Sequence, residues 1–455
     1  MKAVTFVTFW LRRILTMKKY ILIIALVVAI PSVSDCQVVF DLKRCIETGL
    51  QKNYDIRIMR NNQEISDNNL TLGNAGYLPT VDLTTGYSGS VNNTTQNLAN
   101  GEKNKDSGIH NQLLNAGVNL NWTVFDGFNI QTNHQRLKEL QKMGELNTRL
   151  TIENFVSSLA SEYYNYIQQN IRLKNLKSAV KLSKERLRIV EARYEIGAGS
   201  RLDLQQAKVD FNSDSSRLIK QYEILYASRI SLNQMMAADN IEQLIVTTDS
   251  IIEFNQFINK EDIWQKTLSS NTFLLLSNKN KNLSLLDLKT AQSENYPYLK
   301  LNAGYGYTKN IYNTGTINNQ NNLGLTYGVT LGFNLFDGFN RKRKQKNARI
   351  EVENKELQYE QTILSLKADF SNMWMAYRNN IDLTNLEKEN VQTAKENHEI
   401  AIERYKLGDL SGIELREAQN SLLEAEERLI QAEYNTKLCE ISLMQISGQV
   451  ISYSE

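Results

Sequence analysis

Two hydrophobic periods alternate along this chain. Over long stretches without proline, apolar residues recur every seven positions, a spacing typical of α-helices packed as coiled coils. One such series is Leu159, Tyr166, Leu173, Val180, Leu187 and Tyr194. Another, in the C-terminal half, is Phe370, Tyr377, Thr384, Val391, His398 and Tyr405. The pattern predicts helices over residues 129–196 and 340–407, each about 100 Å long at about 1.5 Å per residue.

Shorter helices are predicted on both sides of the long ones. A glycine-containing turn follows each long helix, at residues 197–200 with Gly197 and Gly199, and at residues 408–412 with Gly408 and Gly412. Helices over residues 201–236 and 413–447 are predicted after these turns. A further helix is expected before each of the two prolines that follow the N-terminal segment, Pro79 and Pro297. The helical periodicity before Pro79 extends over about 37 residues. This helix should stack end to end with the helix after Gly199, and the two together should lie beside one long helix.

After each of these prolines the hydrophobic period changes to two, which predicts β-strands. Four strands are expected, over residues 78–92, 113–126, 298–308 and 323–336. Asn-rich polar loops are expected between them, at about residues 92–112 and 308–322. Taken alone, the strands also fit a soluble sandwich sheet with one wet face.

The strand lengths favour a membrane barrel over that sandwich. Each strand is long enough to cross a bilayer when tilted. Four strands cannot close a barrel by themselves, and unpaired strand edges cannot lie in lipid. Several chains would therefore have to share one barrel.

The chain is an internal tandem duplication. The segment Phe125-Asp126-Gly127 recurs as Phe336-Asp337-Gly338, a shift of 211 residues (337 minus 126). Arg193-Tyr194 with Gly197 recurs as Arg404-Tyr405 with Gly408, at the same shift. Two motifs that keep one offset over this distance indicate duplication. The copies are placed at residues 37–239 and 265–455, with a linker at 240–264 around the waist of the helical part.

The N-terminus has the pattern of a secretory signal peptide. Met17-Lys18-Lys19 precedes an apolar run and then small residues, so residues 1–36 are interpreted as the signal, with 1–16 as an extension or an overcalled start. Cleavage after Ser34 or after Cys36 fits equally, and Asp35 disfavours lipidation of Cys36. No later apolar stretch is long enough for a transmembrane helix. An exported chain that meets a membrane would do so as strands.

Composition excludes several classes of function. A net charge of +2 and a pI near 8.1 argue against nucleic-acid binding. Cys45 and Cys439 are too few for a disulfide framework, and the three histidines lie in unrelated segments, so no metal site is expected. No catalytic set or cofactor motif stands out, and the protein is not expected to be an enzyme. A basic run, residues 341–346, lies after the last strand and fits either lipid phosphates or a solvated helix face.

The whole order of elements resembles the TolC-like outer-membrane efflux proteins, the outer-membrane component of tripartite efflux and type I secretion systems. The resemblance rests on Tyr77-Leu78-Pro79, on both Phe-Asp-Gly-Phe junctions, and on Gly408 followed by Ile413-Glu414-Leu415. It implies a mainly α fold with transmembrane β structure. Three protomers would each give four strands to a shared twelve-stranded β-barrel and antiparallel helices to a long coiled-coil barrel in the periplasm.

The resemblance also implies partners and a role. A homotrimer in the outer membrane, in contact with its lipid, would engage a periplasmic adaptor (membrane fusion) protein and an inner-membrane pump. The expected function is a passive, gated exit duct, a porin-like channel for small molecules or drugs. Two alternatives stay open: the outer-membrane component of type I protein secretion, and a structural coiled-coil protein of the envelope that forms no pore.

Residues of a periplasmic gate follow from the resemblance as well. Acidic side chains six and nine residues after the second tip glycine, Glu414 and Glu417, would ring the constriction, raise one another's pKa and select cations. The alternative is a solvated helix start, where acids suit the helix dipole. A closed-state contact would join Tyr405 to Asp203. The basic partner expected two residues after Gly408 is Leu410 here, so this tie is weaker or differently arranged.

Overall fold

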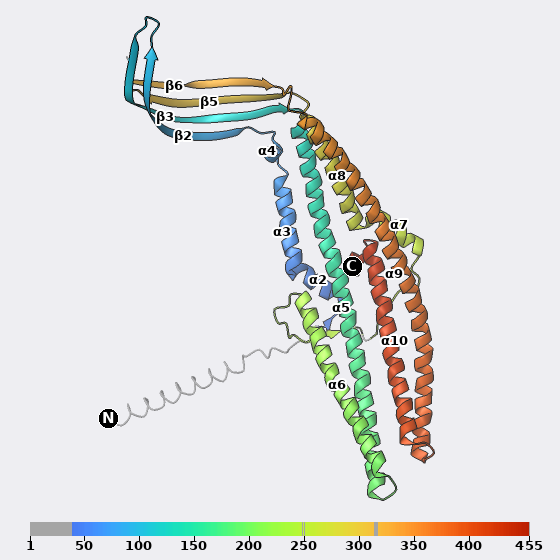
Figure 1. The fold of residues 1–455 in the computed structure, drawn as a ribbon. Coiled ribbons are helices and arrows are strands. Elements are labelled where there is room, and N and C mark those ends of the chain that lie inside the picture. Colours follow the sequence, from blue (N-terminus) through green and yellow to red (C-terminus); the bar gives the residue numbers. More distant parts are fainter. Residues whose placement is uncertain (1–38, 248, 250, 314–316, 455) are drawn as a thin grey trace, which may run out of the picture.

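The computed structural model describes residues 39–247, 249, 251–313 and 317–454. It shows a four-stranded sheet at one end of an elongated bundle of long helices (Figure 1). The fold class expected from sequence, mainly helical with four antiparallel strands and a duplicated unit, is confirmed. The signal peptide expected at residues 1–36 lies outside the described residues.

Two helices run almost the full length of the bundle. They are α5 (Asn129–Glu195) and α9 (Asn340–Leu407), and each turns back at its far end into a shorter helix, α6 (Arg201–Met235) and α10 (Gly412–Ile446). These bounds differ from the predicted ones by at most one residue. Several of the heptad residues that predicted the long helices, among them Leu159 and Tyr377, are buried.

The helices before the two prolines are broken, where the apolar period predicted one continuous helix. In the first copy they are α2 (Leu42–Lys52), α3 (Tyr54–Asn69) and α4 (Leu72–Ala75); in the second, α7 (Lys260–Ser270) and α8 (Thr272–Ser293). Asn53, Thr71 and Asn271 mark the three breaks. Each has an extended ψ and its side chain accepts hydrogen bonds from the backbone of the next helix, which caps that helix and separates it from the previous one.

The sheet is antiparallel throughout, in the order β2 (Thr80–Asn97), β3 (Lys103–Asp126), β5 (Tyr298–Ile311) and β6 (Asn319–Gly332). The first polar loop, expected at about residues 92–112, is mostly strand. A bulge at Asn92–Thr94 and the left-handed Gly108, whose N–H donates to Asn93 Oδ1 at 2.8 Å, bend the end of this hairpin away from the sheet (Figure 1). Both faces of the bent end are exposed, so no two-residue period marks it.

The last strand also ends earlier than predicted. The expected strand at 323–336 stops at Gly332, because its partner β5 begins at Tyr298, which pairs with Gly332. In the first copy Phe125 and Asp126 still pair with Leu299 and Tyr298 and stay in the sheet. Phe336 and Asp337 therefore lie beyond the sheet, whereas their counterparts lie within it.

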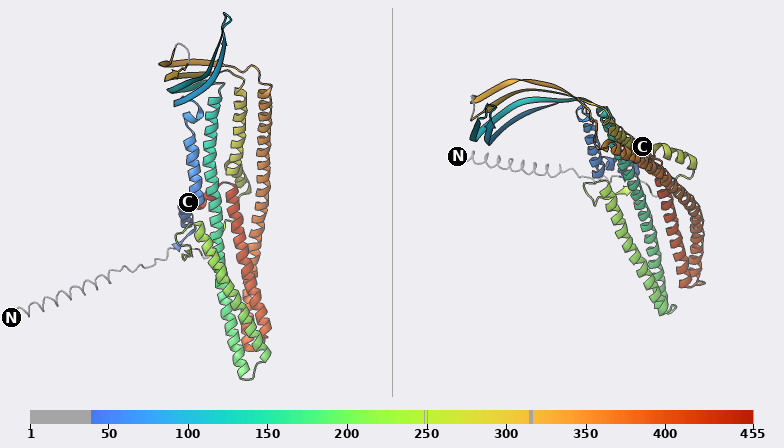
Figure 2. Two further views of the ribbon diagram at one scale, coloured as in Figure 1. Left: turned by 60° about the vertical axis from the view of Figure 1, so that its left-hand side comes forward. Right: turned by 45° about the horizontal axis from the view of Figure 1, so that its top comes forward.

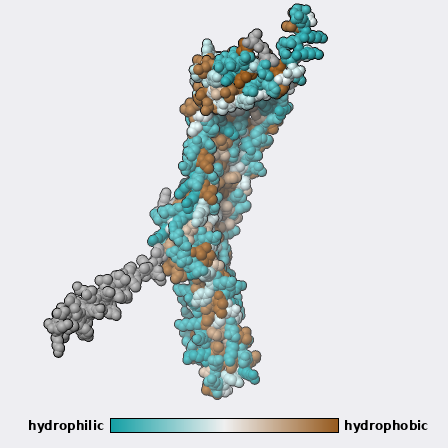
Figure 3. All heavy atoms as spheres, turned by 90° about the vertical axis from the view of Figure 1, so that its left-hand side faces the viewer, coloured by the Kyte–Doolittle hydropathy of each residue, from teal (hydrophilic) through white to brown (hydrophobic). Residues whose placement is uncertain are grey.

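The sheet has one apolar and one polar face. Cross-strand rows such as Leu83, Val118, Tyr305 and Leu325 lie on one face, and rows such as Thr84, Gly117, Gly306 and Gly324 lie on the other. Apolar residues of the first kind are exposed in the single chain, with Leu83 at 79% and Leu325 at 65%. Figure 3 shows hydrophobic residues gathered on the sheet end, above helices whose surface is mostly hydrophilic.

The helices form one layer, ordered differently on either side of the waist (Figure 2). Next to the sheet the order is α3, α5, α8, α9, and toward the tips it is α6, α5, α10, α9. Thus α3 and α6 both pack on α5, and α8 and α10 both pack on α9, as the helix lengths predicted. In the part of this layer next to the sheet, α3 and α9 form the two edges.

The waist holds the main core. The parallel pair β1 (Val39–Phe40) and β4 (Val246–Thr247) packs with Tyr163, Leu232 and Ile441, and with Val450 of the 3-10 helix η1 (Val450–Ser454). The predicted linker at 240–264 thus contains β4 and the first residues of α7. The thiols of Cys45 and Cys439 are both free. Among the described residues, no helix is long and apolar enough to span a membrane.

Candidate functional site: the helical tips and the strand–helix junctions

Both helical tips are built in the same way. Gly197 and Gly408 adopt left-handed φ values of 75° and 82°, which favour glycine after the last turn of a helix. The next residues close matching turns, with Ala198 N donating to Arg193 O at 2.8 Å and Asp409 N donating to Arg404 O at 3.0 Å. The tip glycines thus reverse the chain within a few residues in each copy.

The acids predicted for the gate begin the helices that follow. Ser200 Oγ donates to Asp203 Oδ2 at 2.8 Å, and Ser411 Oγ donates to Glu414 Oε2 at 2.8 Å. Asp203 and Glu414 are equivalent positions of the two copies, offset by 211. The Ser411 backbone N–H, also bonded to Glu414, lowers the pKa of Glu414 together with the hydroxyl. In the single chain, Glu414 is therefore held in a capping box.

Glu417 stands differently. Its side chain is exposed and pairs with no other group in the described part of the chain. It lies one turn further along α10 than Glu414. Of the two acids predicted to ring the constriction, Glu417 has the carboxylate that is free to face other chains.

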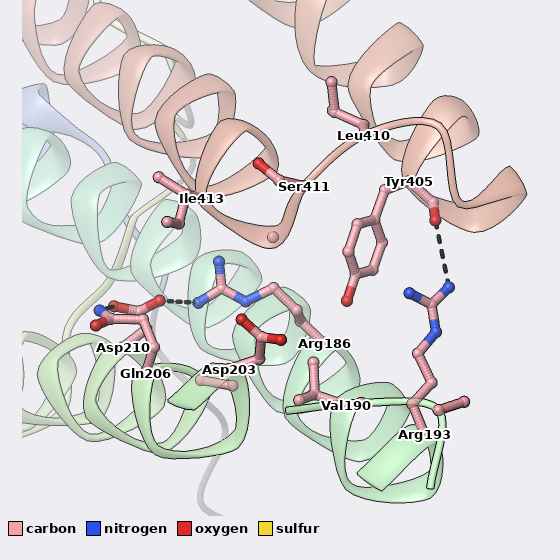
Figure 4. Close-up of a pocket in the computed structure, with 14 residues that line it drawn as sticks. Arg186, Val190, Arg193, Asp203, Gln206, Asp210, Tyr405, Leu410, Ser411 and Ile413 are labelled. Carbon is pink, nitrogen blue, oxygen red and sulfur yellow. Dashed lines mark hydrogen bonds and ion pairs between the residues drawn. The ribbon is translucent and has the colours of Figure 1, made fainter. Parts of the chain in front are cut away.

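A pocket of about 220 Å³ separates the two tips. Tyr405 of α9 reaches into it from one side and Asp203 of α6 lines the other (Figure 4). The guanidinium of Arg193 lies 5.0 Å from the Tyr405 ring centre and donates to the Tyr405 carbonyl at 3.4 Å. No hydrogen bond joins Tyr405 to Asp203 in the described chain. Leu410 lines the same pocket with an apolar side chain, at the position where a basic residue was expected.

A buried charge cluster just behind the pocket was not predicted. Arg416 of α10 donates to both carboxylate oxygens of Asp214 on α6, at 2.7 and 2.8 Å. Asp214 is fully buried and accepts these bonds from the other helical hairpin. Arg186 of α5 is paired with Asp210 of α6, and its Nη1 is buried in the pocket wall without a hydrogen-bond partner. A comparison of the two copies would have singled out Asp214, which occupies the position of Ala425, but it would not have identified its partner Arg416.

The strand–helix junctions are also duplicated. Asp126 Oδ1 accepts from Ile130 N at 3.0 Å, and Asp337 Oδ2 accepts from Arg341 N at 2.8 Å, so each aspartate caps a long helix. Gly127 and Gly338 have φ values of 72° and 69°. A side chain at Gly127 would collide with the Ser293 carbonyl and the Tyr296 side chain. The aspartate caps and the positive φ values, which both copies share, explain the Asp-Gly part of the repeated motif.

The phenylalanines of the two junctions differ in their surroundings. Phe128 packs edge-on against Phe125, at 5.1 Å between ring centres, and against Tyr296, at 5.8 Å. Tyr296 precedes Pro297 and belongs to the second copy. Phe339 packs on Phe336 at 5.3 Å but has no third aromatic partner in the described chain, and it is 70% exposed. Pro79 is preceded by Leu78, which is 57% exposed.

No site for catalysis or metal binding is evident in the part of the chain that the structure describes. No cluster of three or more His, Cys, Asp or Glu side chains that could hold a metal ion occurs among those residues. The arrangement at the tips can hold hairpins together and present carboxylates, and it offers no activated nucleophile.

Comparisons with known proteins agree with this architecture. Residues 45–238 and 265–449 match the family described as outer membrane efflux protein, once for each copy. The antibiotic efflux pump outer membrane protein ArpC of Pseudomonas putida is 21% identical over 413 residues, covering 90% of this chain and 82% of ArpC. The outer membrane protein TolC of Vibrio cholerae is 20% identical over 391 residues, covering 83% and 84%.

Solved structures of similar fold include the CmeC outer membrane channel of Campylobacter jejuni. It superposes with a TM-score of 0.75 at 18% identity, over 91% of this chain and 87% of CmeC. The outer membrane protein VceC of Vibrio cholerae gives a TM-score of 0.73 at 16% identity, over 90% and 96%.

Proposed function

This chain belongs to the outer membrane efflux protein family, and we propose that three copies of it close into one gated conduit through which small molecules leave the cell. The sheet would form the part in the outer membrane and the helices a tunnel in the periplasm. The observation that carries the proposal is a sheet with one apolar face and two unpaired edge strands, β2 and β6. Such a sheet is stable in lipid only when its edges are paired with further chains.

The helix layer has open edges at the same places. On one edge, Ile58, Ile65 and Leu72 are spaced by seven residues and exposed. On the other edge, Ile350, Leu357 and Leu364 have the same spacing and are 48–69% exposed. Each of these two heptad seams lacks a partner within the described part of one chain. The two seams complete each other when α9 of one chain packs on α3 of the next chain.

The duplication indicates how that contact is made. Within one chain, Phe128 of the first copy packs on Tyr296, which precedes the proline of the second copy. The same relation continued to the next chain puts Phe339 on Leu78, which precedes the proline of the first copy. A closed ring then repeats one kind of interface inside and between chains. The family resemblance gives three as the number of chains.

The tips would form the gate at the periplasmic end. Three chains would bring three Glu417 carboxylates around one axis, with the capped Glu414 of each chain one turn away. Clustered carboxylates attract cations and disfavour anions. The Tyr405–Asp203 pocket would be the contact between hairpins that changes when the tips separate.

The cargo would be small molecules, moved by an inner-membrane pump through a periplasmic adaptor. Support comes from the family and from similar proteins named for efflux of antibiotics and of toluene. This chain offers no energy-coupling site of its own among the described residues, which suits a passive duct.

Conductance tests the proposal. Purified protein inserted into a planar lipid bilayer should give discrete current steps, with cations carrying more current than anions. A protein that inserts and yields no steps would favour the alternative of a coiled coil without a pore.

A further inference from the structure

We propose that a basic stripe at the start of α9, formed by Lys342, Lys346 and Arg349, binds phosphate groups of lipid headgroups in the periplasmic leaflet of the outer membrane. The three residues are spaced i, i+4 and i+7, so they lie on one face of the helix. All three are exposed. The inference rests on the membrane placement of the sheet and adds a lipid site to the proposed function.

The cations of this stripe are unsatisfied within the chain. Two neighbouring basic residues have partners, since Arg341 lies 3.4 Å from Asp337 and Lys344 lies 2.7 Å from Glu294. In the part of the chain that the structure describes, Lys342, Lys346 and Arg349 form no ion pair. A row of three free cations favours an anionic ligand from outside the chain.

The stripe begins where the membrane-facing surface ends. The exposed apolar residues Leu331, near the end of β6, and Phe333 and Leu335, directly after it, lead toward α9. Lys342 lies in the first turn of α9, and Arg349 is about 10 Å further along the helix. Beyond it the same face becomes acidic, at Glu353 and Glu360. The three cations thus form a cluster at the sheet end of α9, separated by these acids from the next basic residue of this face, Lys367.

The handedness of the chain places the stripe on the outer side of the layer. Thr326 Oγ1 of β6 donates to Gly304 O of β5 at 3.3 Å. The polar-face residues of β5 therefore direct their backbone N–H and C=O groups toward β6. Apolar-face residues of β6 then direct theirs away from β5. Because the residues are L amino acids, β5 then lies to the right of β6 for a viewer who looks at the apolar face with the helices below the sheet, so that β6 runs downward.

The helices keep the order of the strands, so α8 lies to the right of α9 in the same view. Gln345, whose side chain donates to Ala291 O on α8, marks the side of α9 that faces α8. In a right-handed helix, Arg349, Lys342 and Lys346 lie about 40°, 60° and 100° from that side, all turned toward the viewer. The stripe therefore faces the same way as the apolar face of the sheet, outward toward lipid.

The first copy shows that helix packing does not require these charges. The residues equivalent to Lys342, Lys346 and Arg349 are Gln131, Gln135 and Lys138, so two of the three cations occur in the second copy alone. Both copies nevertheless form the same junction and the same long helix. One lipid site per chain is expected, near the contact between neighbouring chains.

Lipid binding by the detergent-solubilised full-length protein tests the proposal. Native mass spectrometry would compare dioleoyl phosphatidylglycerol with dioleoyl phosphatidylcholine, for the wild type and for the variant Lys342→Gln, Lys346→Gln, Arg349→Gln. The wild type should bind phosphatidylglycerol more tightly, and the variant should lose at least about tenfold in that affinity. Added sodium chloride should weaken wild-type binding.

A matched control removes three exposed cations far from the sheet, with Lys181→Gln, Lys184→Gln and Lys220→Gln. It should bind phosphatidylglycerol like the wild type. Equal affinity of the wild type for the two lipids, or an equal loss in both variants, would overturn the proposal. The same spectra report the number of chains in each complex, so a failure of assembly is distinguished from a failure of lipid binding.

Discussion

Arg416 and Asp214 join the two helical hairpins of one chain through two hydrogen bonds, at 2.7 and 2.8 Å, close to the periplasmic tips. Asp214 is completely buried, and the Arg416 side chain is 14% exposed. The hydrogen bonds to the Asp214 side chain raise the pKa of Arg416. The pair joins α10 to α6 behind the pocket that is lined by Leu410, the position where a basic residue was expected.

Removing either member of this pair should loosen the tips, and Arg416→Ala should cost more stability than Asp214→Ala. Arg416→Ala leaves the buried Asp214 carboxylate without a counter-ion, and the expected cost is about 3–5 kcal/mol in the free energy of unfolding. Asp214→Ala should cost less, because Arg416 can turn toward solvent and the second copy already has Ala425 at this position. Thermal unfolding together with hydrogen exchange in the first turns of α10 would measure both. Equal costs, or none, would mean that the pair does not hold the hairpins.

The two tip acids should contribute unequally to ion selectivity. The double variant Glu414→Gln, Glu417→Gln is expected to lower the preference of the channel for cations. Glu417→Gln alone should account for most of that change, because the Glu414 carboxylate is bonded to Ser411. Reversal potentials in a salt gradient would report the cation preference. Unchanged selectivity in the double variant would remove the carboxylate ring from the account.

A charge introduced on the apolar face of the sheet should destabilise the protein in a bilayer, and a charge on the polar face should not. Leu325 lies on the apolar face and the adjacent Thr326 on the polar face. Leu325→Arg is expected to cost about 2–4 kcal/mol of stability in a bilayer, the usual penalty near the membrane midplane. Thr326→Arg, the matched control, should be tolerated. The folded fraction in lipid vesicles across a urea series would compare them, and equal tolerance would contradict the assignment of the apolar face to lipid.

His398 should make the helical tunnel sensitive to mild acid. It is buried in a seam where the first copy has Leu187, and burial lowers its pKa below the ordinary 6.5, against a smaller opposing effect of Glu399. The unfolded chain then binds the proton more readily, so stability falls as the pH drops below about 6.5. His398→Leu should therefore raise the melting temperature more at pH values below 6.5 than at higher ones. A pH-independent difference would show that His398 does not titrate in this range.

The parts of the fold that repeat a period were predictable from sequence. Heptads and the 211-residue offset gave both long helices and their turns, because burial imposes a regular spacing on every turn of a packed helix. The helix breaks were missed, since Asn53, Thr71 and Asn271 each act through one local cap that leaves the apolar period unchanged.

The bent end of the first hairpin was missed for a related reason. The distance from proline to the Asp-Gly motif is seven residues longer in the first copy (126 minus 79) than in the second (337 minus 297). Those residues extend two strands that are exposed on both faces, and strands without a buried face have no hydrophobic period. The Arg416–Asp214 pair was missed because it joins helices whose relative position no local pattern reveals.

The contact between Leu78 of one chain and Phe339 of the next tests the closed assembly most directly. In a background with the three native cysteines replaced by alanine, Leu78→Cys and Phe339→Cys would be treated with a short bifunctional thiol reagent after reconstitution into lipid vesicles. Phe128→Cys with Tyr296→Cys is the positive control within one chain, and Leu78→Cys with Ile413→Cys, at opposite ends of the molecule, is the negative control.

Denaturing gels would then count the chains that have been joined. The account predicts covalent species of two and three chains for the Leu78–Phe339 pair, and none above three. A product of one chain only, or a yield no higher than that of the Leu78–Ile413 pair, would contradict it.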